Sequence, residues 1–148
     1  MTAPLGTRER IDRTRARAWA LQVHYGWESS GGGGTLRDAL MVTLGNRRVS
    51  PRRLPYVKQL LGLVDEHLPQ LDRMLHDALE NWRLERLSAI DRGILRLAAA
   101  ELLHVDEVPP KVTIQEAIRL AEQYGGPDSP RFVNGVLDAL YKRALPQG

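Results

Sequence analysis

The residues in this sequence with the clearest chemical potential are arginines near its N-terminus. Residues 1–17 hold five arginines against one aspartate and one glutamate, so this segment alone carries the +3 charge of the whole 148-residue chain. A guanidinium group binds phosphate through a bidentate fork and stacks on nucleic-acid bases. The five are Arg8, Arg10, Arg13, Arg15 and Arg17. Their clustering indicates contact with a polyanion.

Catalytic and metal-binding patterns are absent from the sequence. The histidines are scattered and form no His-Glu-x-x-His or other ligand spacing; they are His24, His67, His76 and His104. The acidic pair Asp106 and Glu107 has no nucleophile or metal ligand beside it. The chain has no cysteine, which excludes disulfides and thiolate metal sites. We therefore expect no cofactor, and an enzyme ranks behind an RNA-binding protein and a helical protein–protein scaffold.

A second group of residues with binding potential opens the last predicted helix. Ser129 followed by Pro130 is typical of an N-cap and a first helical residue, and the helix is expected to end near residue 143. Its apolar arc comprises Val133, Val136, Leu137 and Leu140. Phe132 lies roughly 90° from the centre of this arc, beside Arg131 and close to Asp128. The ring is interpreted either as an edge-of-core residue or as a platform for stacking.

The arginine-rich segment leads into a helix with one apolar side. We expect residues 1–12 to form a flexible basic arm. The apolar side of the helix comprises Ala16, Trp19, Ala20, Val23 and Trp27. Arg8, Arg15 and Gln22 repeat every seven residues and share one flank, with Tyr25 farther round. This flank suits RNA; the alternative is a frayed, solvated terminus with Tyr25 packed at an edge.

Glycine, proline and capping signals divide the middle of the chain. A flexible linker occupies 28–34, and a Thr35–Asp38 capping box opens a short helix that ends near Gly45. The arginine-rich stretch 46–53 is interpreted as a solvated loop. Because proline is tolerated in a first helical turn but not deep inside a helix, helices are expected over 55–67 and from 69 onward.

The helix predicted after Ser88 is apolar over an unusually wide arc. Ser88 and Asp91 form its capping box. The arc comprises Ile90, Ile94, Leu95, Leu97, Ala98 and Leu102, which is typical of a helix in the middle of a bundle. Glu101 projects onto the same side and must be paired there, since an isolated buried charge is very costly. Thr113 and Glu116 are expected to cap the next helix, as far as Tyr124.

The pattern as a whole predicts an all-α protein. No segment shows strand-like alternation, and we count seven helices in two packed bundles, helices one to three and four to seven. Residues 1–148 are expected to form a single domain, with an N-terminal helical subdomain at 13–67 and a C-terminal one at 68–148. Hydrophobic content of 43% and charged content of 26% are ordinary for a globular protein. Without a membrane-length apolar run or a signal-type N-terminus, we expect a cytoplasmic protein.

Several blocks of the sequence, taken together and in order, resemble the family of the transcription antitermination factor NusB. They are NWRLERLS at 81–88, IDRGILRL at 90–97, ELL at 101–103, VPPKV at 108–112, EAI at 116–118 and DSPRFVNGVLD at 128–138. The N-terminal positions Arg15, Arg17, Gln22, Tyr25 and Trp27 also stand at family spacing. The resemblance is dense over 80–141, clear over 8–28 and weak between them. Gln115 and Ala100 depart from it, where asparagine and an aromatic residue are common.

The resemblance implies an all-helical fold and a function in transcription. NusB-like proteins bind the boxA element of ribosomal RNA transcripts together with NusE, a small-subunit ribosomal protein, within the RNA polymerase antitermination complex. By this resemblance, the RNA-binding residues are Arg13, Arg15, Arg17, Gln22, Tyr25, Lys111, Asp128, Arg131 and Phe132. Asp91 and Arg92 are expected to face NusE, although capping its own helix is an equally good role for Asp91. A helical scaffold, or a homodimer without RNA function, is the alternative.

Overall fold

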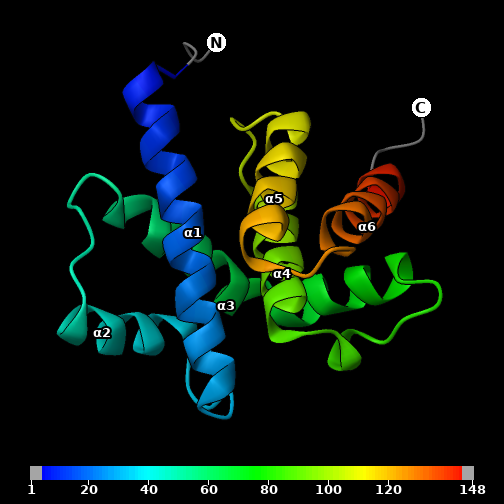
Figure 1. The fold of residues 1–148 in the computed structure, drawn as a ribbon, viewed down its shortest axis with the longest axis horizontal. Coiled ribbons are helices and arrows are strands. Elements are labelled where there is room, and N and C mark those ends of the chain that lie inside the picture. Colours follow the sequence, from blue (N-terminus) through cyan, green and yellow to red (C-terminus); the bar gives the residue numbers. More distant parts are fainter. Residues whose placement is uncertain (1–4, 145–148) are drawn as a thin grey trace.

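The computed structural model describes residues 5–144, and every regular element within this range is helical (Figure 1). The elements are α1 (Thr7–Ser29), α2 (Leu36–Asn46), α3 (Leu54–Ala78), the short 3-10 helix η1 (Leu84–Arg86), α4 (Ala89–His104), α5 (Pro110–Tyr124) and α6 (Ser129–Ala144). The predicted all-α fold is confirmed. None of the described helices is long and apolar enough to cross a lipid bilayer.

One long helix, α3, takes the place of two predicted ones. The backbone leaves helical geometry only at His67, where φ is −115° and ψ is 15°, and Pro69 lies two residues later. Pro69 removes one helical hydrogen bond and bends the chain. Leu61 and Leu71, on either side of the bend, are both fully buried. Continuing the helix keeps both apolar stretches in the core, so the described residues form six α-helices rather than the predicted seven.

The centre of the fold is α4, which packs against α1, α3, α5 and α6. Its wide apolar arc is buried as predicted, through Ile94, Leu95, Leu97 and the run Ala98, Ala99 and Ala100. α1 and α6 lie on opposite sides of the α4–α5 pair (Figure 1). The buried residues contributed by α1 to α4 and by α5 and α6 form one continuous core. The predicted boundary between subdomains, at 67/68, falls at the bend of α3.

Gly93 allows α1 and α4 to approach closely. A Cβ atom at this position would lie 2.8 Å from Nδ1 of His24 and 3.0 Å from Cδ1 of Leu21. His24 is fully buried in this contact. Any larger residue at Gly93 would push the two helices apart, so this glycine fixes the distance between α1 and α4.

The helix starts follow the predicted capping signals only in part. At α2 the complete Thr35–Asp38 box forms. At α4, Ser88 Oγ accepts from the Asp91 N–H at 3.1 Å. The return bond of that box is missing from the hydrogen bonds of the described residues, and Asp91 Oδ1 is buried without a partner among them. Ser129, predicted as an N-cap, is instead the first residue of α6, and its hydroxyl accepts from the Gly126 N–H at 3.0 Å.

The predicted capping box at Thr113 and Glu116 is wrong. α5 begins earlier, at Pro110, whose missing N–H suits a first helical turn. Both side chains turn toward other helices: Thr113 donates to Glu101 at 2.7 Å, and Glu116 accepts from Arg17 at 2.9 Å. The two residues stand three apart, as a capping box requires, but their side chains bond to residues of other helices instead of capping α5.

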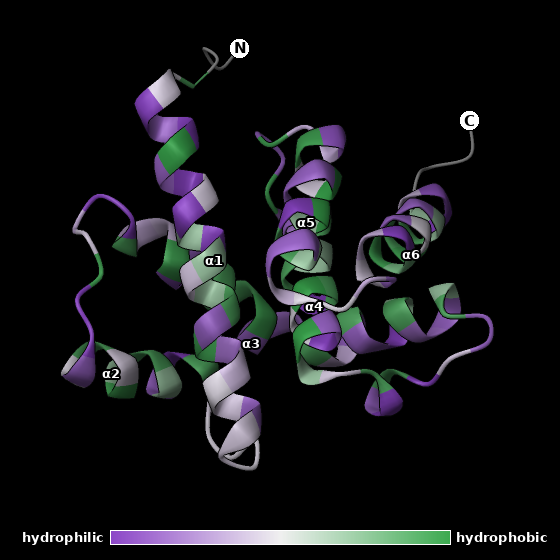
Figure 2. Ribbon diagram, viewed as in Figure 1, coloured by the Kyte–Doolittle hydropathy of each residue, from purple (hydrophilic) through white to green (hydrophobic). Residues whose placement is uncertain are grey.

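The first helix begins earlier than predicted. α1 starts at Thr7, so residues 7–12 of the expected flexible arm form its first turns. Residues 1–4 of the arm lie outside the described residues. Hydrophilic residues predominate in this first part of α1, in contrast to the mixed faces of the later helices (Figure 2).

Candidate nucleic-acid interface

One flank of α1 presents polar and aromatic side chains to solvent. Arg8, Arg15 and Gln22 are all exposed, as their seven-residue spacing predicted. Tyr25, one turn farther along the helix, is 48% exposed and thus not packed at an edge. The flank therefore combines guanidinium groups, an amide and a phenol ring, the groups with which proteins contact RNA phosphates and bases.

Arg17 does not belong to this exposed flank. Only 7% of the residue is exposed, because it points between α4 and α5. Its Nε lies 2.8 Å from Glu101 Oε2, and its Nη1 lies 2.9 Å from Glu116 Oε1. Burial works to lower the pKa of Arg17, but the charge and hydrogen bond of Glu101 outweigh it and raise that pKa. The predicted RNA contact by Arg17 is thus replaced by a structural role.

Glu101 is the centre of a buried polar cluster. It is 2% exposed and accepts hydrogen bonds from Arg17, Tyr56 and Thr113. Burial raises the pKa of Tyr56, and the Glu101 charge beside the phenol adds to this effect. The expectation that Glu101 is paired is confirmed. Because the four residues come from α1, α3, α4 and α5, the cluster fixes how α1 and its exposed flank are placed relative to α5.

Arg13 is partly engaged within the protein. Its Nη2 lies 3.1 Å from Glu107 Oε1, in the connection between α4 and α5, and its guanidinium carbon lies 4.5 Å from the centre of the Tyr56 ring. Lys111 is exposed in the first turn of α5, which follows that connection. The N-terminal parts of α1 and α5 therefore bring basic groups together at one end of the molecule.

A groove runs between α1 and α5. Its lining includes residues from both helices: Ile11, Arg15, Ala18, Arg119, Gln123 and Tyr124. Arg119 bridges to Glu116 at 3.3 Å, and Tyr124 is 52% exposed. Sequence reasoning missed Arg119 and Tyr124, because only the fold, which places α5 across the groove from α1, brings them near Arg15. The one local signal was an aromatic residue placed directly before the two glycines that end α5.

Phe132 lies at the rim of the core, as its helical position predicted. The ring is partly buried and packs against the core residues. Its outer side meets Trp82, with the ring centres 6.0 Å apart and an edge-to-face angle of 75°. Trp82 is 60% exposed, and Asp128 and Arg131 beside Phe132 are exposed too. Trp82 comes from the connection before η1, and no local pattern indicated that it would lie next to Phe132.

Asp91 and Arg92 differ in their freedom to bind a partner. Arg92 donates to Glu28 through Nε at 2.6 Å and to the Leu84 and Leu87 carbonyls through Nη1 at 3.0 and 2.8 Å. The Glu28 hydrogen bond raises the pKa of Arg92 against the opposing effect of burial. Arg92 therefore ties α4 to α1 and η1. Asp91, in contrast, is partly exposed, although its Oδ1 is buried without a partner among the described residues.

The two departures from the expected family pattern have different settings. Ala100 is fully buried in α4, where it is part of the continuous core. Gln115 is exposed and lines a second groove, beside Glu107, Pro109 and Val112 at the N-terminal end of α5. The departure at Ala100 thus affects the packing of the core, and the departure at Gln115 affects the surface of a groove.

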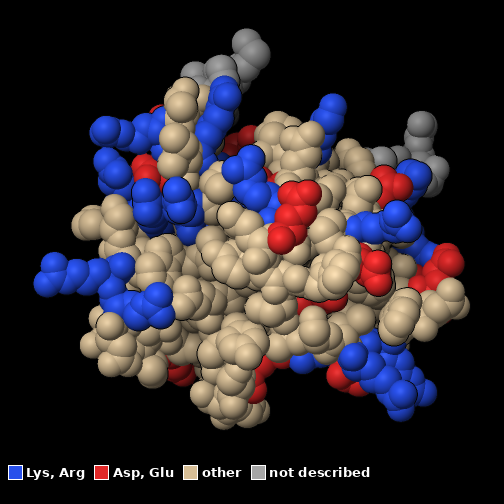
Figure 3. Space-filling model, viewed as in Figure 1, with Lys and Arg blue, Asp and Glu red and all other residues tan. Residues whose placement is uncertain are grey.

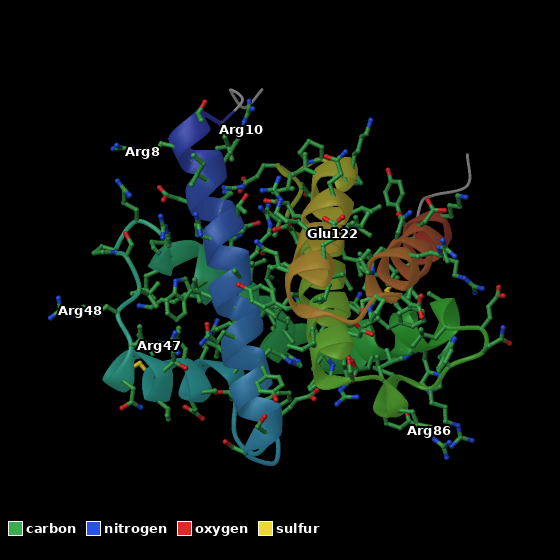
Figure 4. All side chains as sticks on the ribbon, in the orientation of Figure 1. Arg8, Arg10, Arg47, Arg48, Arg86 and Glu122 are labelled. Carbon is green, nitrogen blue, oxygen red and sulfur yellow. The ribbon has the colours of Figure 1, made fainter. Side chains whose placement is uncertain are left out.

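Basic side chains form a cluster at the end of the molecule where α1 begins. Lys and Arg cluster over the N-terminal part of α1 and the neighbouring connection between α2 and α3, whereas the middle of the same face carries few of them (Figure 3). Arg8, Arg47 and Arg48 follow one edge of the molecule, while Glu122 lies on the central part (Figure 4). Arg86 lies at the opposite edge of the same view, within a second group of basic side chains (Figures 3 and 4).

Comparison with known proteins places these features in a family. Residues 14–142 match the sequence profile of the NusB family. Transcription antitermination protein NusB of Desulfosudis oleivorans is 36% identical over 88% of this chain and 85% of its own length. The corresponding protein of Pseudothermotoga lettingae is 50% identical over 55% of this chain. This match covers 59% of that relative's length.

Solved structures give the same result. A structure of T. maritima NusB superposes with a TM-score of 0.80 at 32% identity, covering 99% of this chain and 96% of that one. A chain from the crystal structure of antitermination factors NusB and NusE in complex with dsRNA superposes with a TM-score of 0.78 at 27% identity. That match covers 93% of this chain and 99% of the other.

Proposed function

The chain belongs to the NusB family, and from that premise we propose that it is an RNA-binding antitermination factor that recognises boxA RNA together with NusE. In this role it associates with the antitermination complex of RNA polymerase in the cytoplasm and supports transcription and maturation of ribosomal RNA. It binds and positions RNA and catalyses no reaction. The solved complex of family members with NusE and double-stranded RNA supports both partners.

The observation that carries this proposal is the exposed flank of α1 and its groove toward α5. Arg15 belongs to both, with Gln22 and Tyr25 following on α1 and Arg119 and Tyr124 facing it from α5. Arginine contacts to phosphate supply affinity, and aromatic rings offer stacking surfaces for unpaired bases. This combination favours single-stranded RNA over a duplex, whose bases are already stacked.

The ends of α5 extend the RNA surface in both directions. Lys111 and the basic start of α1 lie at one end, and Asp128, Arg131 and Phe132 follow the other end. The 15 residues of α5 span about 20 Å at the helical rise. We assign the phosphate contacts to the first end and base stacking to Phe132 with Trp82 at the second.

The NusE-facing residue of this proposal is Asp91. Asp91 is partly exposed in the first turn of α4, so its carboxylate can accept a hydrogen bond from a partner protein. Arg92 supports the same surface by holding η1 against α4, since its guanidinium is bound within the chain.

A titration with boxA-like RNA, in the presence and absence of NusE, tests the proposed function. We expect single-stranded RNA to bind more tightly than a duplex of the same sequence, and NusE to strengthen binding. The logarithm of the association constant should fall by about 0.7 per phosphate contact for each decade of salt. An RNA affinity indifferent to salt, or no binding with or without NusE, would contradict the proposal.

A homodimer is the alternative supported by a specific observation. Met41 and Val42, adjacent on α2, are 66% and 69% exposed. Sedimentation of the protein across a concentration series separates the alternatives, because a dimer that masks the RNA surface must dissociate when RNA is added. If RNA leaves the monomer–dimer equilibrium unchanged, the result would favour the scaffold function.

A further inference from the structure

The connection between α2 and α3 belongs to a stretch of chain with an extreme charge composition. Residues 39–64 contain five of the 21 Lys and Arg residues and none of the 18 Asp and Glu residues. They are Arg47, Arg48, Arg52, Arg53 and Lys58. Arg47, Arg48 and Arg52 are exposed. The excess positive charge of the whole protein thus depends on this stretch as well as on the start of α1.

This connection lies alongside α1 in the fold. Arg53 Nε is 3.2 Å from Asp12 Oδ1, and Arg52 Nε is 3.5 Å from Asp12 Oδ2. Two turns farther along α1, the Arg47 guanidinium carbon lies 5.4 Å from the centre of the Trp19 ring. The two basic segments, far apart in the sequence, are therefore neighbours on the surface.

Arg15 joins the connection to the groove between α1 and α5. It follows Asp12 by three residues and precedes Trp19 by four, so it shares their side of α1. The same residue lines the groove that contains Arg119 and Tyr124. The basic surface therefore continues from the groove, across the exposed flank of α1, to Arg47 and Arg48.

We propose that the α2–α3 connection, through Arg47, Arg48 and Arg52, is a second RNA-binding segment that contacts the phosphates of nucleotides flanking the boxA element. The inference rests on the proposed function, which assigns RNA to the flank of α1. An RNA strand that extends beyond this flank past Arg15 would lie beside the α2–α3 connection. Its contacts there are with the backbone and therefore independent of sequence.

The composition of the connection favours RNA over a protein partner. Val49 in the connection and Leu54 at the start of α3 are partly buried against the core rather than presented to solvent. Protein interfaces usually need an apolar centre, which this segment does not offer. Among the ion pairs of residues 5–144, Asp12 is the one carboxylate that pairs with arginines of this connection, so its exposed guanidinium groups suit a chain of phosphates.

The experiment compares two single-stranded RNAs, a short boxA-like RNA and the same RNA lengthened at both ends. Arg47→Gln/Arg48→Gln should weaken binding of the long RNA about fifteenfold at 0.15 M salt, because each of the two lost phosphate contacts is worth about fourfold there. It should change binding of the short RNA less than twofold. The salt dependence of the long RNA should fall by about 1.4 log units per decade.

Arg73→Gln/Arg143→Gln is the matched control, since it removes two exposed arginines from α3 and α6. This control should leave both affinities unchanged, and thermal melting should show that both double variants fold. Equal affinity of the two RNAs for the unmodified protein, or equal loss in both double variants, would overturn the inference. So would a loss of NusE capture without a loss of RNA affinity, which would mark a protein-binding surface.

The two proposals fail in different ways. If the short RNA binds and lengthening adds nothing, the second segment is wrong and the proposed function stands. If only the long RNA binds, and Arg47→Gln/Arg48→Gln abolishes that binding, the second segment is supported and boxA recognition is wrong. If neither RNA binds, both are wrong.

Discussion

Arg17 on α1 and Glu101 on α4 form an ion pair inside the protein, with Nε of the arginine 2.8 Å from Oε2 of the glutamate. Tyr56 and Thr113 donate to the same carboxylate, so its charge is compensated by three helices. A charge this deeply buried is tolerated only while its partners remain. The pair therefore links the stability of the fold to the position of α1.

Removing the cation of this pair should destabilise the protein strongly. Arg17→Met leaves the Glu101 carboxylate buried with hydrogen bonds but no counter-ion, and we expect a loss of about 3–5 kcal/mol in the free energy of unfolding. Arg13→Met is the control, because its partner Glu107 is exposed and such pairs contribute about 0–1 kcal/mol. Urea denaturation measures both. Similar losses in the two variants would show that the buried pair has no special role.

Truncating the aromatic pair should affect RNA binding more than stability. Phe132→Ala and Trp82→Ala should each cost about 1–3 kcal/mol of affinity for single-stranded RNA, the usual contribution of one base stacked on one ring. Because Phe132 is only partly buried, its loss should destabilise the fold by less than the roughly 3–5 kcal/mol of a core phenylalanine. Trp82→Ala should melt almost as the unmodified protein does. If Phe132→Ala melts at a much lower temperature but binds RNA as tightly as the unmodified protein, Phe132 is a core residue and not a stacking platform.

Reversing the charge of Asp91 should weaken NusE binding. Asp91→Lys removes a partly exposed carboxylate from the first turn of α4 and places a cation at a helix N-terminus, which should cost the fold about 1 kcal/mol. Asp106→Lys makes the same charge change in an exposed connection beyond the other end of α4. Capture of NusE by the folded variants is the measurement. Undiminished capture by Asp91→Lys would show that this carboxylate serves only its own helix.

Acidification should destabilise the fold through His24. Burial lowers the pKa of His24 to about 4, with Glu28 opposing this shift and Arg96 and Arg92 adding to it. Between about pH 4 and its ordinary value near 6.5, the unfolded chain binds more protons at this residue than the folded one. Stability is thus fully present above pH 6.5 and falls as the pH drops toward 4, by about 3 kcal/mol in total. Unfolding measured across this range checks the slope.

Two substitutions isolate the His24 contribution. His24→Leu replaces the imidazole with an apolar side chain of similar size that cannot titrate. The free energy of unfolding of this variant should therefore vary less between pH 4 and 6.5. His76→Leu, at an exposed position of α3, should leave the slope unchanged. If both variants retain the full slope, another group is responsible for the acid sensitivity.

The sequence was most informative where structure depends on neighbouring residues. The Thr35–Asp38 box formed as predicted because capping is a contact between residues three apart. The wide apolar arc that contains Ile94 and Leu97 correctly placed α4 at the centre, since such a helix has no face for solvent. The seven-residue spacing of Arg8, Arg15 and Gln22 likewise predicted a shared exposed flank.

Features that depend on tertiary contacts escaped prediction. Arg15 and Arg17 look equivalent in a basic segment, yet they project about 200° apart on a helix, one to solvent and one to Glu101. Pro69 correctly signalled a disturbance, but burial on both sides of it kept α3 continuous. Trp82 reaches Phe132 only through packing across the fold.

Because α3 continues through the bend at His67, it also determines how the protein should unfold. α3 packs against α1 and α2 and also against α4 and α6, so neither half of the chain can release it without disturbing the other. A single element shared in this way couples the two regions thermodynamically. Heating should therefore produce one cooperative transition, with equal calorimetric and van't Hoff enthalpies. Splitting the chain at 67/68 would cut the element on which that cooperativity depends.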